Sequence, residues 1–210
     1  MNFSDECREC PRLSGFLDEV RREHPDYHAK PVVPFGDAEP RLVIVGLAPG
    51  MHGANRTGRP FTGDYAGILL YETLHRFGFA SRPVSESARD GLELIGCRIT
   101  NAVKCLPPQN KPEPAEIRQC NGYLRAEIAA LPPDAVILAL GNIAHGAVLR
   151  AQDAKLKDHP FGHAAVHRLP GGRTLYDSYH CSRYNTQTKR LTPAMFEAVF
   201  ARIRADFEES

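Results

Sequence analysis

Three short apolar runs, rich in β-branched residues, restrict the fold of this chain more than any other feature. They are RLVIVG (41–46), CRITNAV (97–103) and AVILALG (135–141). Runs of this length are typical of strands that are buried on both faces, as in a parallel sheet covered by helices. The sequence therefore predicts that these three segments form the centre of such a sheet.

Helical periodicity between and after these runs supports the same architecture. Apolar residues at helical spacing occupy 66–77, 117–131, 144–151 (with Asn142 as the predicted N-cap) and 196–203 (after Thr192-Pro193). Weaker strand candidates are 164–169 and 173–180. This alternation predicts an α/β fold, a three-layer α/β/α arrangement around a central, mainly parallel sheet of four to five strands. In such folds, ligands bind beyond the carboxyl ends of the strands.

Composition excludes several other classes of protein. The chain has 210 residues, 42% hydrophobic and 24% charged, with a net charge of +1, which is typical of a globular protein, here interpreted as one domain over residues 1–210. The longest near-unbroken apolar stretch, AVILAL (135–140), is far shorter than the ~20 residues that span a bilayer. The first ten residues lack the apolar core of a signal peptide. We therefore expect a cytoplasmic protein with no membrane partner. Charge is nevertheless uneven: residues 168–190 are locally basic, which suits a phosphate-binding edge.

Six cysteines in a chain without an export signal indicate metal ligands or core residues rather than disulfides. Cys7 and Cys10 form a C-x2-C pair, and Cys105 and Cys120 flank a proline-rich loop. Since C-x2-C with a second pair is also typical of zinc sites, spacing alone does not select the metal. Cys97 and Cys181 match no ligand position, and we expect Cys97 to be buried as a small hydrophobic residue.

Three polar loops follow strand candidates and are expected to meet at one edge of the sheet. They span 46–64, 99–114 and 178–192. The first is rich in glycine and can bring backbone amides close to a ligand. It lacks GxxxxGK[ST], which argues against a P-loop NTPase. The third places His180 among small polar residues ahead of a helix.

Taken together, these loops resemble the uracil-DNA glycosylase superfamily, specifically its family 5 (type B) branch. The similarity lies in GLAPGMHGANRTGRPFTGD, ITNAVKCLPPQNKP and YHCSRYNTQT, and extends from Cys7 to about Thr192. One departure is His180-Cys181-Ser182, where His-Pro-Ser is usual. The resemblance implies a 4Fe–4S cluster held by Cys7, Cys10, Cys105 and Cys120. It also implies a monomeric repair enzyme that flips uracil, hypoxanthine or xanthine out of double-stranded DNA and hydrolyses its bond to the sugar.

The resemblance further assigns roles to single residues. Phe61 is expected to stack on the base, and Asn101 to bind the Watson–Crick edge, with Asn110 as the alternative. His180 is expected to stabilise the leaving base, either as a neutral donor or as a cation. Backbone amides around Ala48 and Gly50 are further candidate donors, and Ala48 stands where other families have a water-activating residue. Asp64 is either a catalytic carboxylate or the N-cap of the helix at 66–77. The candidate catalytic residues are therefore Asp64, Asn101 and His180.

DNA phosphates are expected to contact Arg56, Arg59, Arg183, Asn185 and Lys189, contacts that position DNA without reading its sequence. Two alternatives remain at this point. One is a family 4-like glycosylase restricted to uracil, and the other is a non-catalytic nucleic-acid-binding protein with a zinc or iron–sulfur site.

Overall fold

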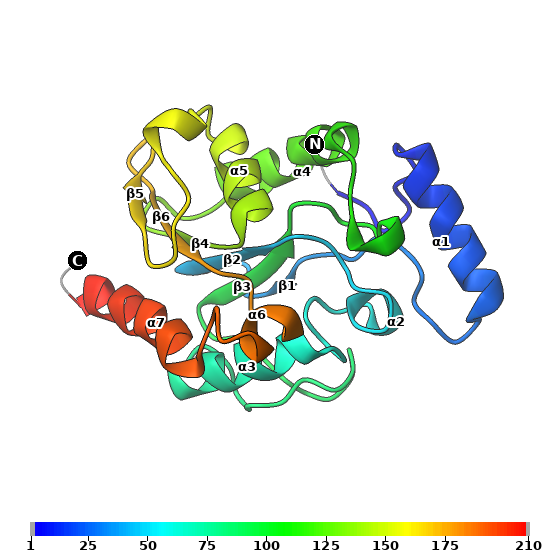
Figure 1. Cartoon of the computed structure of the whole chain (residues 1–210), viewed down its shortest axis with the longest axis horizontal. Helices are drawn as coiled ribbons and strands as arrows, with labels where there is room; N and C mark the ends of the chain where they lie inside the picture. Colours follow the sequence, from blue (N-terminus) through cyan, green and yellow to red (C-terminus); the bar gives the residue numbers. More distant parts are fainter. Residues whose placement is uncertain (1–2, 209–210) are drawn as a thin grey trace.

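A six-stranded sheet, in the order β1-β3-β2-β4-β6-β5, forms the centre of the computed structural model, which describes residues 3–208 (Figure 1). Its four central strands run parallel and are β3 (Cys97–Asn101), β2 (Leu42–Gly46), β4 (Val136–Leu140) and β6 (Thr174–Ser178). Two edge strands pair antiparallel to them, β1 (Phe35–Gly36) and β5 (Val166–Arg168). The predicted α/β class is confirmed. The sheet has six strands rather than four to five, because the two-residue β1 carries no apolar run that would reveal it.

Helices cover both faces of the sheet (Figure 1). One layer is formed by α3 (Tyr65–Arg76) and α7 (Pro193–Glu208), the other by α4 (Pro114–Ala129) and α5 (Asn142–Ala151). Side chains alternate along β2, so Leu42 and Ile44 join the first core and Val43 and Val45 the second. This burial on both faces explains why the strand has no polar position.

The start of α5 differs from the prediction by one residue. Gly141, not Asn142, is the N-cap, with φ at +92°, and Asn142 is the first helical residue. The Gly141 N–H donates to the carbonyl of Ser178, with N and O 2.8 Å apart. Glycine suits this position because the backbone lies in the left-handed region. The predicted start of α7 is confirmed, since Thr192 Oγ1 accepts from Met195 N at 3.2 Å.

A helix that the sequence analysis did not identify, α1 (Pro11–Glu23), packs beside the sheet rather than on it (Figure 1). Its apolar residues, Leu13, Leu17 and Val20, form a third small core with Cys105, Cys120 and Tyr123. Shorter elements are α2 (Ala54–Thr57), α6 (Arg183–Gln187), η1 (Pro108–Asn110) and η2 (Leu156–Asp158). Among residues 3–208, none of the helices combines the length and hydropathy needed to cross a bilayer.

Strand order directs attention to one edge of the sheet. The chain leaves β2 for β3 on one side and then returns to β4 on the other side of β2. Loops at the carboxyl ends of the strands therefore diverge around β2, which is where ligands bind in open α/β sheets. At this edge Gly46 lies directly opposite Asn101.

Candidate active site

A pocket of about 570 Å³ opens at the carboxyl ends of β2 and β3, beside the segment that follows β6. Its size is that of a small-molecule site. Its walls include all seven residues predicted for base binding and catalysis: Ala48, Gly50, Phe61, Asp64, Asn101, Asn110 and His180. The three loops thus converge as their positions after the strands predicted.

We call Phe61, Asn101 and His180 the pocket floor. Around Phe61 and Asn101 the floor is tightly packed. Phe61 has φ at +53°, which is unusual for an aromatic residue, and only 7% of it is exposed. A Cβ on Gly46 would lie 2.4 Å from Asn101 Oδ1 and 2.7 Å from the Phe61 ring, while a Cβ on Gly67 would lie 1.8 Å from the Phe61 carbonyl oxygen. Glycine at position 46 therefore makes room for the Phe61 ring and the Asn101 amide, and glycine at position 67 makes room for the Phe61 backbone.

Asn101 carries a buried acceptor that no protein group satisfies. The residue is 3% exposed, and its Oδ1 has no hydrogen-bond partner among residues 3–208. Leaving a buried polar atom unpaired is costly, so such an atom in a pocket marks a place for a ligand donor or a water molecule. Asn110, by contrast, is exposed at the rim, on a turn with φ at +56°.

His180 stands beside Phe61, two residues after the end of β6. The two ring centroids are 5.8 Å apart, and the planes differ by 29°. Burial lowers the pKa of His180 to about 4, because a desolvated imidazole disfavours the charged form. The ring is therefore neutral at neutral pH and can act as a hydrogen-bond donor without carrying charge.

Asp64 faces the pocket and also caps a helix. Its Oδ1 accepts from Gly67 N at 3.0 Å, at the start of α3. The second carboxylate oxygen lies beside Gly53, where a Cβ would come within 2.4 Å of it. Burial raises the pKa of Asp64, although hydrogen bonds from the Gly67 and Ala66 amides oppose the shift. The capping contact is confirmed, and it leaves one oxygen available to the pocket.

Several residues of the pocket wall were missed by the sequence analysis, among them three with large side chains. Met51 and His52 belong to the glycine-rich loop, and Tyr65 is the first residue of α3. Tyr65 is 43% exposed, and the guanidinium carbon of Arg183 lies 5.9 Å from its ring centroid. Tyr65 directly follows Asp64, so its place in the motif was a usable signal.

Of the predicted phosphate contacts, Arg56, Arg183 and Lys189 are exposed, and Arg183 lines the pocket. The prediction for Arg59 is wrong. Its side chain is 5% exposed, and Nη1 lies 2.7 Å from Asp90 Oδ1, so it holds the loop together and is not available to a phosphate. Asn185 also has an internal partner, because its Nδ2 donates to the His180 carbonyl at 2.8 Å.

The basic 168–190 stretch does not form one continuous edge. Arg168 and Arg173 lie at the amino end of β6, where Arg168 Nη1 donates to Thr174 Oγ1 at 3.0 Å. Arg173 is bound to the carbonyl oxygens of Leu131 and Pro132. The pocket lies at the carboxyl ends of the parallel strands, so these two arginines lie at the opposite end of the sheet.

Cys7, Cys10, Cys105 and Cys120 lie together, lining one small pocket between α1, α4 and the loop after β3. Burial raises the pKa of Cys10 to about 11 and raises the pKa of Cys105 and of Cys120, with the neighbouring sulfurs adding to the effect. The four thiols form an all-sulfur donor set, of the kind that both zinc and iron–sulfur sites use.

The two remaining cysteines are core residues. Cys97 and Cys181 are both fully buried and belong to the core beneath α3 and α7. The burial of Cys97 is as predicted. Cys181, where proline is usual, fills the apolar space directly after His180.

Comparison with known proteins agrees with this geometry. The profile of the uracil DNA glycosylase superfamily matches residues 33–204. A type-5 uracil-DNA glycosylase of Thermus thermophilus is 50% identical over 90% of this chain and 89% of its own length. One of Pyrobaculum aerophilum is 42% identical, covering 95% and 88% respectively. A type-4 enzyme of Thermotoga maritima is 40% identical but covers only 54% of this chain.

An α/β sheet with its pocket at this edge, and a superfamily match over most of the chain, define a glycosylase. The chain belongs to the uracil DNA glycosylase superfamily. The type-5 relatives match it nearly end to end, whereas the type-4 relative matches about half. Within the superfamily it belongs to the type-5 branch.

Proposed function

We propose that this chain removes uracil from double-stranded DNA by hydrolysing the bond between the base and its sugar. The observation that carries the proposal is the unpaired, buried Oδ1 of Asn101 on a pocket floor shared with Phe61 and His180. Uracil offers an N3–H donor between two carbonyl acceptors, and the carboxamide of Asn101 can accept from the first and donate to one of the others. The type-5 relatives carry the name of this activity.

Base recognition follows from the shape of the floor. A flipped base stacks on Phe61 and places its hydrogen-bonding edge on Asn101, since enzymes that act on bases read them in this manner. Asn110 is exposed at the rim, and we assign it to the nucleotide outside the floor. Hypoxanthine and xanthine, which present a similar carbonyl and N–H edge, are proposed as further substrates.

Cleavage is proposed to be dissociative, with negative charge developing on the departing base. His180 donates a hydrogen bond to that charge as a neutral ring, consistent with a pKa lowered to about 4. Amides of the 47–50 segment add further donors. Each well-placed donor contributes roughly 2.7–4 kcal/mol, so two or three give about 6–12 kcal/mol, which reaches the ~8 kcal/mol of a modest enzymatic acceleration. The reaction can therefore proceed with Ala48 in place of a water-activating side chain.

Asp64 is proposed to act through its second carboxylate oxygen. This oxygen faces the pocket beside Gly50 and Gly53, where it can stabilise the sugar cation or hold the attacking water. The first oxygen remains on the helix cap, which fixes the orientation of the carboxylate.

A 4Fe–4S cluster held by Cys7, Cys10, Cys105 and Cys120 is proposed as the cofactor. The all-thiol donor set, gathered around one small pocket, supports it. The cluster would cross-link three segments, and the role we assign to it is structural. The Lys104 amide donates to Cys120 Sγ at 3.4 Å, and Tyr123 Oη lies 3.7 Å from Cys7 Sγ; both contacts orient the ligands.

Duplex cleavage tests the proposed function. Purified protein should release uracil from a 5′-labelled U-containing duplex, seen as a strand break after alkali, and leave the matched T-containing duplex intact. A panel with hypoxanthine, xanthine and single-stranded substrates ranks the bases and separates this activity from a family 4-like enzyme restricted to uracil. Binding of DNA with no cleavage of any base would contradict the proposal. We expect the active species to be a monomer in the cytoplasm.

A further inference from the structure

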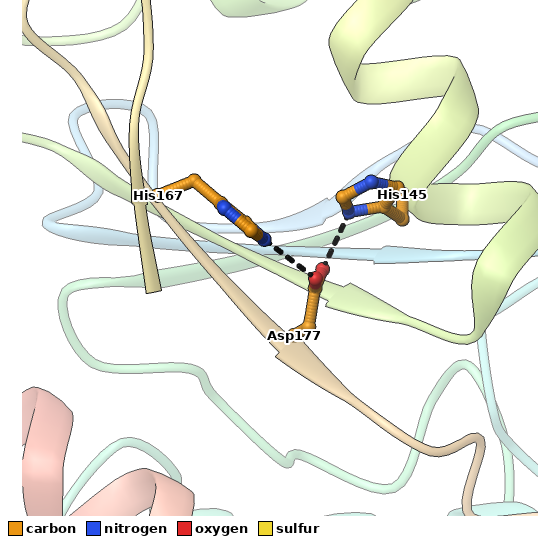
Figure 2. A group of neighbouring side chains, drawn as sticks. All are labelled: His145, His167 and Asp177. Carbon is orange, nitrogen blue, oxygen red and sulfur yellow. Dashed lines mark hydrogen bonds and ion pairs between the residues drawn. The ribbon is translucent and has the colours of Figure 1, made fainter. Parts of the chain in front are cut away.

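A buried polar cluster lies behind the strand that leads to His180. Asp177, on β6, lies between His145 on α5 and His167 on β5 (Figure 2). Its Oδ1 is 2.8 Å from His145 Nδ1, and its Oδ2 is 3.1 Å from His167 Nε2. Asp177 and His145 are fully buried, and the His167 side chain is 11% exposed. None of the three lines the active-site pocket.

Oxygen atoms face both ring nitrogens of His145. Nδ1 faces the Asp177 carboxylate, and Nε2 faces the His159 carbonyl oxygen at 2.9 Å. Both partners are acceptors, but a neutral imidazole has only one N–H and would leave one nitrogen lone pair against an oxygen. With both nitrogens protonated, His145 satisfies both partners and its charge balances that of Asp177. His167 then donates to the second carboxylate oxygen.

The distances between the Asp177 oxygens and the two histidine rings fit direct hydrogen bonds better than shared coordination of a metal ion. Two histidines and a carboxylate are a common metal-binding set, and these donor atoms do lie within 4.8 Å of one another. However, ligand atoms on one tetrahedral zinc ion lie about 3.3 Å apart, whereas Asp177 approaches the two rings at 2.8 and 3.1 Å. These are ordinary hydrogen-bond lengths.

The cluster joins the elements that surround the His180 backbone. His145 belongs to the start of α5. The N-cap of this helix, Gly141, donates its N–H to the Ser178 carbonyl. A Cβ added to Gly141 would lie 3.5 Å from the His180 Cβ, so the two residues are neighbours. On the other side, the loop after α5 holds the same strand, because Tyr179 N donates to His163 Nδ1 at 3.3 Å. By linking α5, this loop and β6, Asp177 fixes the strand end from which His180 projects.

We propose that His145, Asp177 and His167 are positioning residues for His180, acting through a buried imidazolium–carboxylate pair. The proposal rests on the role of His180 in the proposed function. Misplacing a reacting group by about 1 Å can cost on the order of 100-fold in rate. Loss of the pair should therefore slow cleavage much more than it weakens DNA binding.

Ring protonation is tested first, and without substrate. Nitrogen-15 NMR of histidine-labelled protein, assigned with His145→Gln, should show both His145 ring nitrogens bonded to protons at pH 7. A singly protonated ring would overturn the proposal. So would one zinc ion per chain that EDTA removes together with a change in the His145 signals. These readouts stand even if the protein cleaves no DNA, in which case the proposed function fails and not the pair.

Kinetics test the positioning role. Asp177→Asn should lower the single-turnover rate on a U-containing duplex by 10- to 100-fold, with the DNA dissociation constant within twofold of wild type. Tyr176→Phe is the matched control, because it removes a partly buried hydrogen bond to Asp206 from the neighbouring position on the same strand. It should lower thermal stability and keep the full rate. An unchanged rate in Asp177→Asn, or an equal fall in Tyr176→Phe, would overturn the proposal.

A second variant covers the case in which Asp177→Asn does not fold. His167→Ala removes one donor at the edge of the cluster and leaves the buried pair in place. Its rate should fall at least threefold with DNA binding unchanged. A wild-type rate in this variant would mean that the cluster serves stability alone.

Discussion

Phe61 and His180 lie face to face across the pocket floor, with ring centroids 5.8 Å apart. The strained backbone of Phe61 and the end of β6 therefore converge on one contact, although the two residues are 119 positions apart in the chain. The contact places the proposed base-stacking surface beside the proposed donor for the departing base. It also contributes to the burial that keeps His180 uncharged. Five predictions follow from this arrangement and from the groups around it.

Removing the His180 ring should slow cleavage without weakening DNA binding. The interaction exists mainly in the transition state, because neutral bound uracil carries little charge on its oxygen. His180→Ala should lower the single-turnover rate by about 10²–10³-fold, or ~2.7–4 kcal/mol. His180→Gln, which keeps a neutral N–H donor, should retain more activity than alanine. A loss explained wholly by a weaker dissociation constant would remove His180 from the mechanism.

The rate should depend weakly on pH near neutrality. Since burial lowers the pKa of His180 to about 4, the neutral ring persists well below the usual histidine range. The single-turnover rate should stay level from pH 8 to about pH 5.5 and fall only in more acidic buffer, whereas a cationic donor would give a rate that rises below pH 6.5. The same shift means that the stability His180 contributes is present above pH 6.5 and is lost as pH falls toward 4. Denaturant titrations between pH 4.5 and 8 measure that slope.

Two substitutions should separate the helix-capping role of Asp64 from its proposed role in cleavage. Asparagine caps helices about as well as aspartate, while alanine costs about 1 kcal/mol at such a position. Asp64→Asn should therefore change the free energy of unfolding little and still lower the cleavage rate, and Asp64→Ala should lower both. If Asp64→Asn cleaves at the wild-type rate, the carboxylate is a helix cap only.

The salt dependence of DNA binding should distinguish Arg183 from Arg168, which lie at opposite ends of β6. Each phosphate contact adds about −0.9 to the slope of log K against log salt concentration. Arg183→Ala should make that slope shallower by roughly one unit and weaken all sequences alike. Arg168→Ala, at the opposite end of β6, is the matched control and should leave the slope unchanged. Equal effects of the two would mean that the protein binds DNA without a defined face.

Iron content should depend on one set of cysteines only. Anaerobically purified protein should be brown, absorb near 400 nm and contain iron. Cys105→Ala should lose iron and solubility before it loses chemistry, because both α1 and the loop after β3 would be released. Cys97→Ala, at a buried position away from the set, should keep the iron. One zinc per chain with no iron in the wild type would contradict the proposed cofactor.

The central strands and the pocket were predictable because their signals are local. β2 and β4 are continuous apolar runs, β3 is a short strand with β-branched residues, and polar loops directly follow β2 and β3. Helix α1 also had a local signal, since Leu13, Leu17 and Val20 are spaced for one helical face after a proline. Its omission was an error of interpretation rather than a limit of the sequence.

Other features had no local signal. The burial of Arg59 depends on Asp90, 31 positions away in a segment without regular structure. The pairing of His145 with Asp177 spans 32 positions and two elements. The basic 168–190 stretch is divided because the chain runs along β6 from one end of the sheet to the other. Arg173 and Arg183 therefore lie at opposite ends of one strand. Patterns in a single sequence do not reveal pairs of residues that only the fold brings together.

The close packing of Gly46 against Asn101 and Phe61 has a consequence for substrate range. Any side chain at position 46 would collide with both residues, so a substitution there would displace the Asn101 amide that we propose to bind the base. A purine extends beyond the footprint of a pyrimidine and must therefore find its extra room at the entrance, among Ala48, Met51 and Asn110. Differences in base preference among homologous enzymes should accordingly trace to the entrance residues, while the floor stays the same.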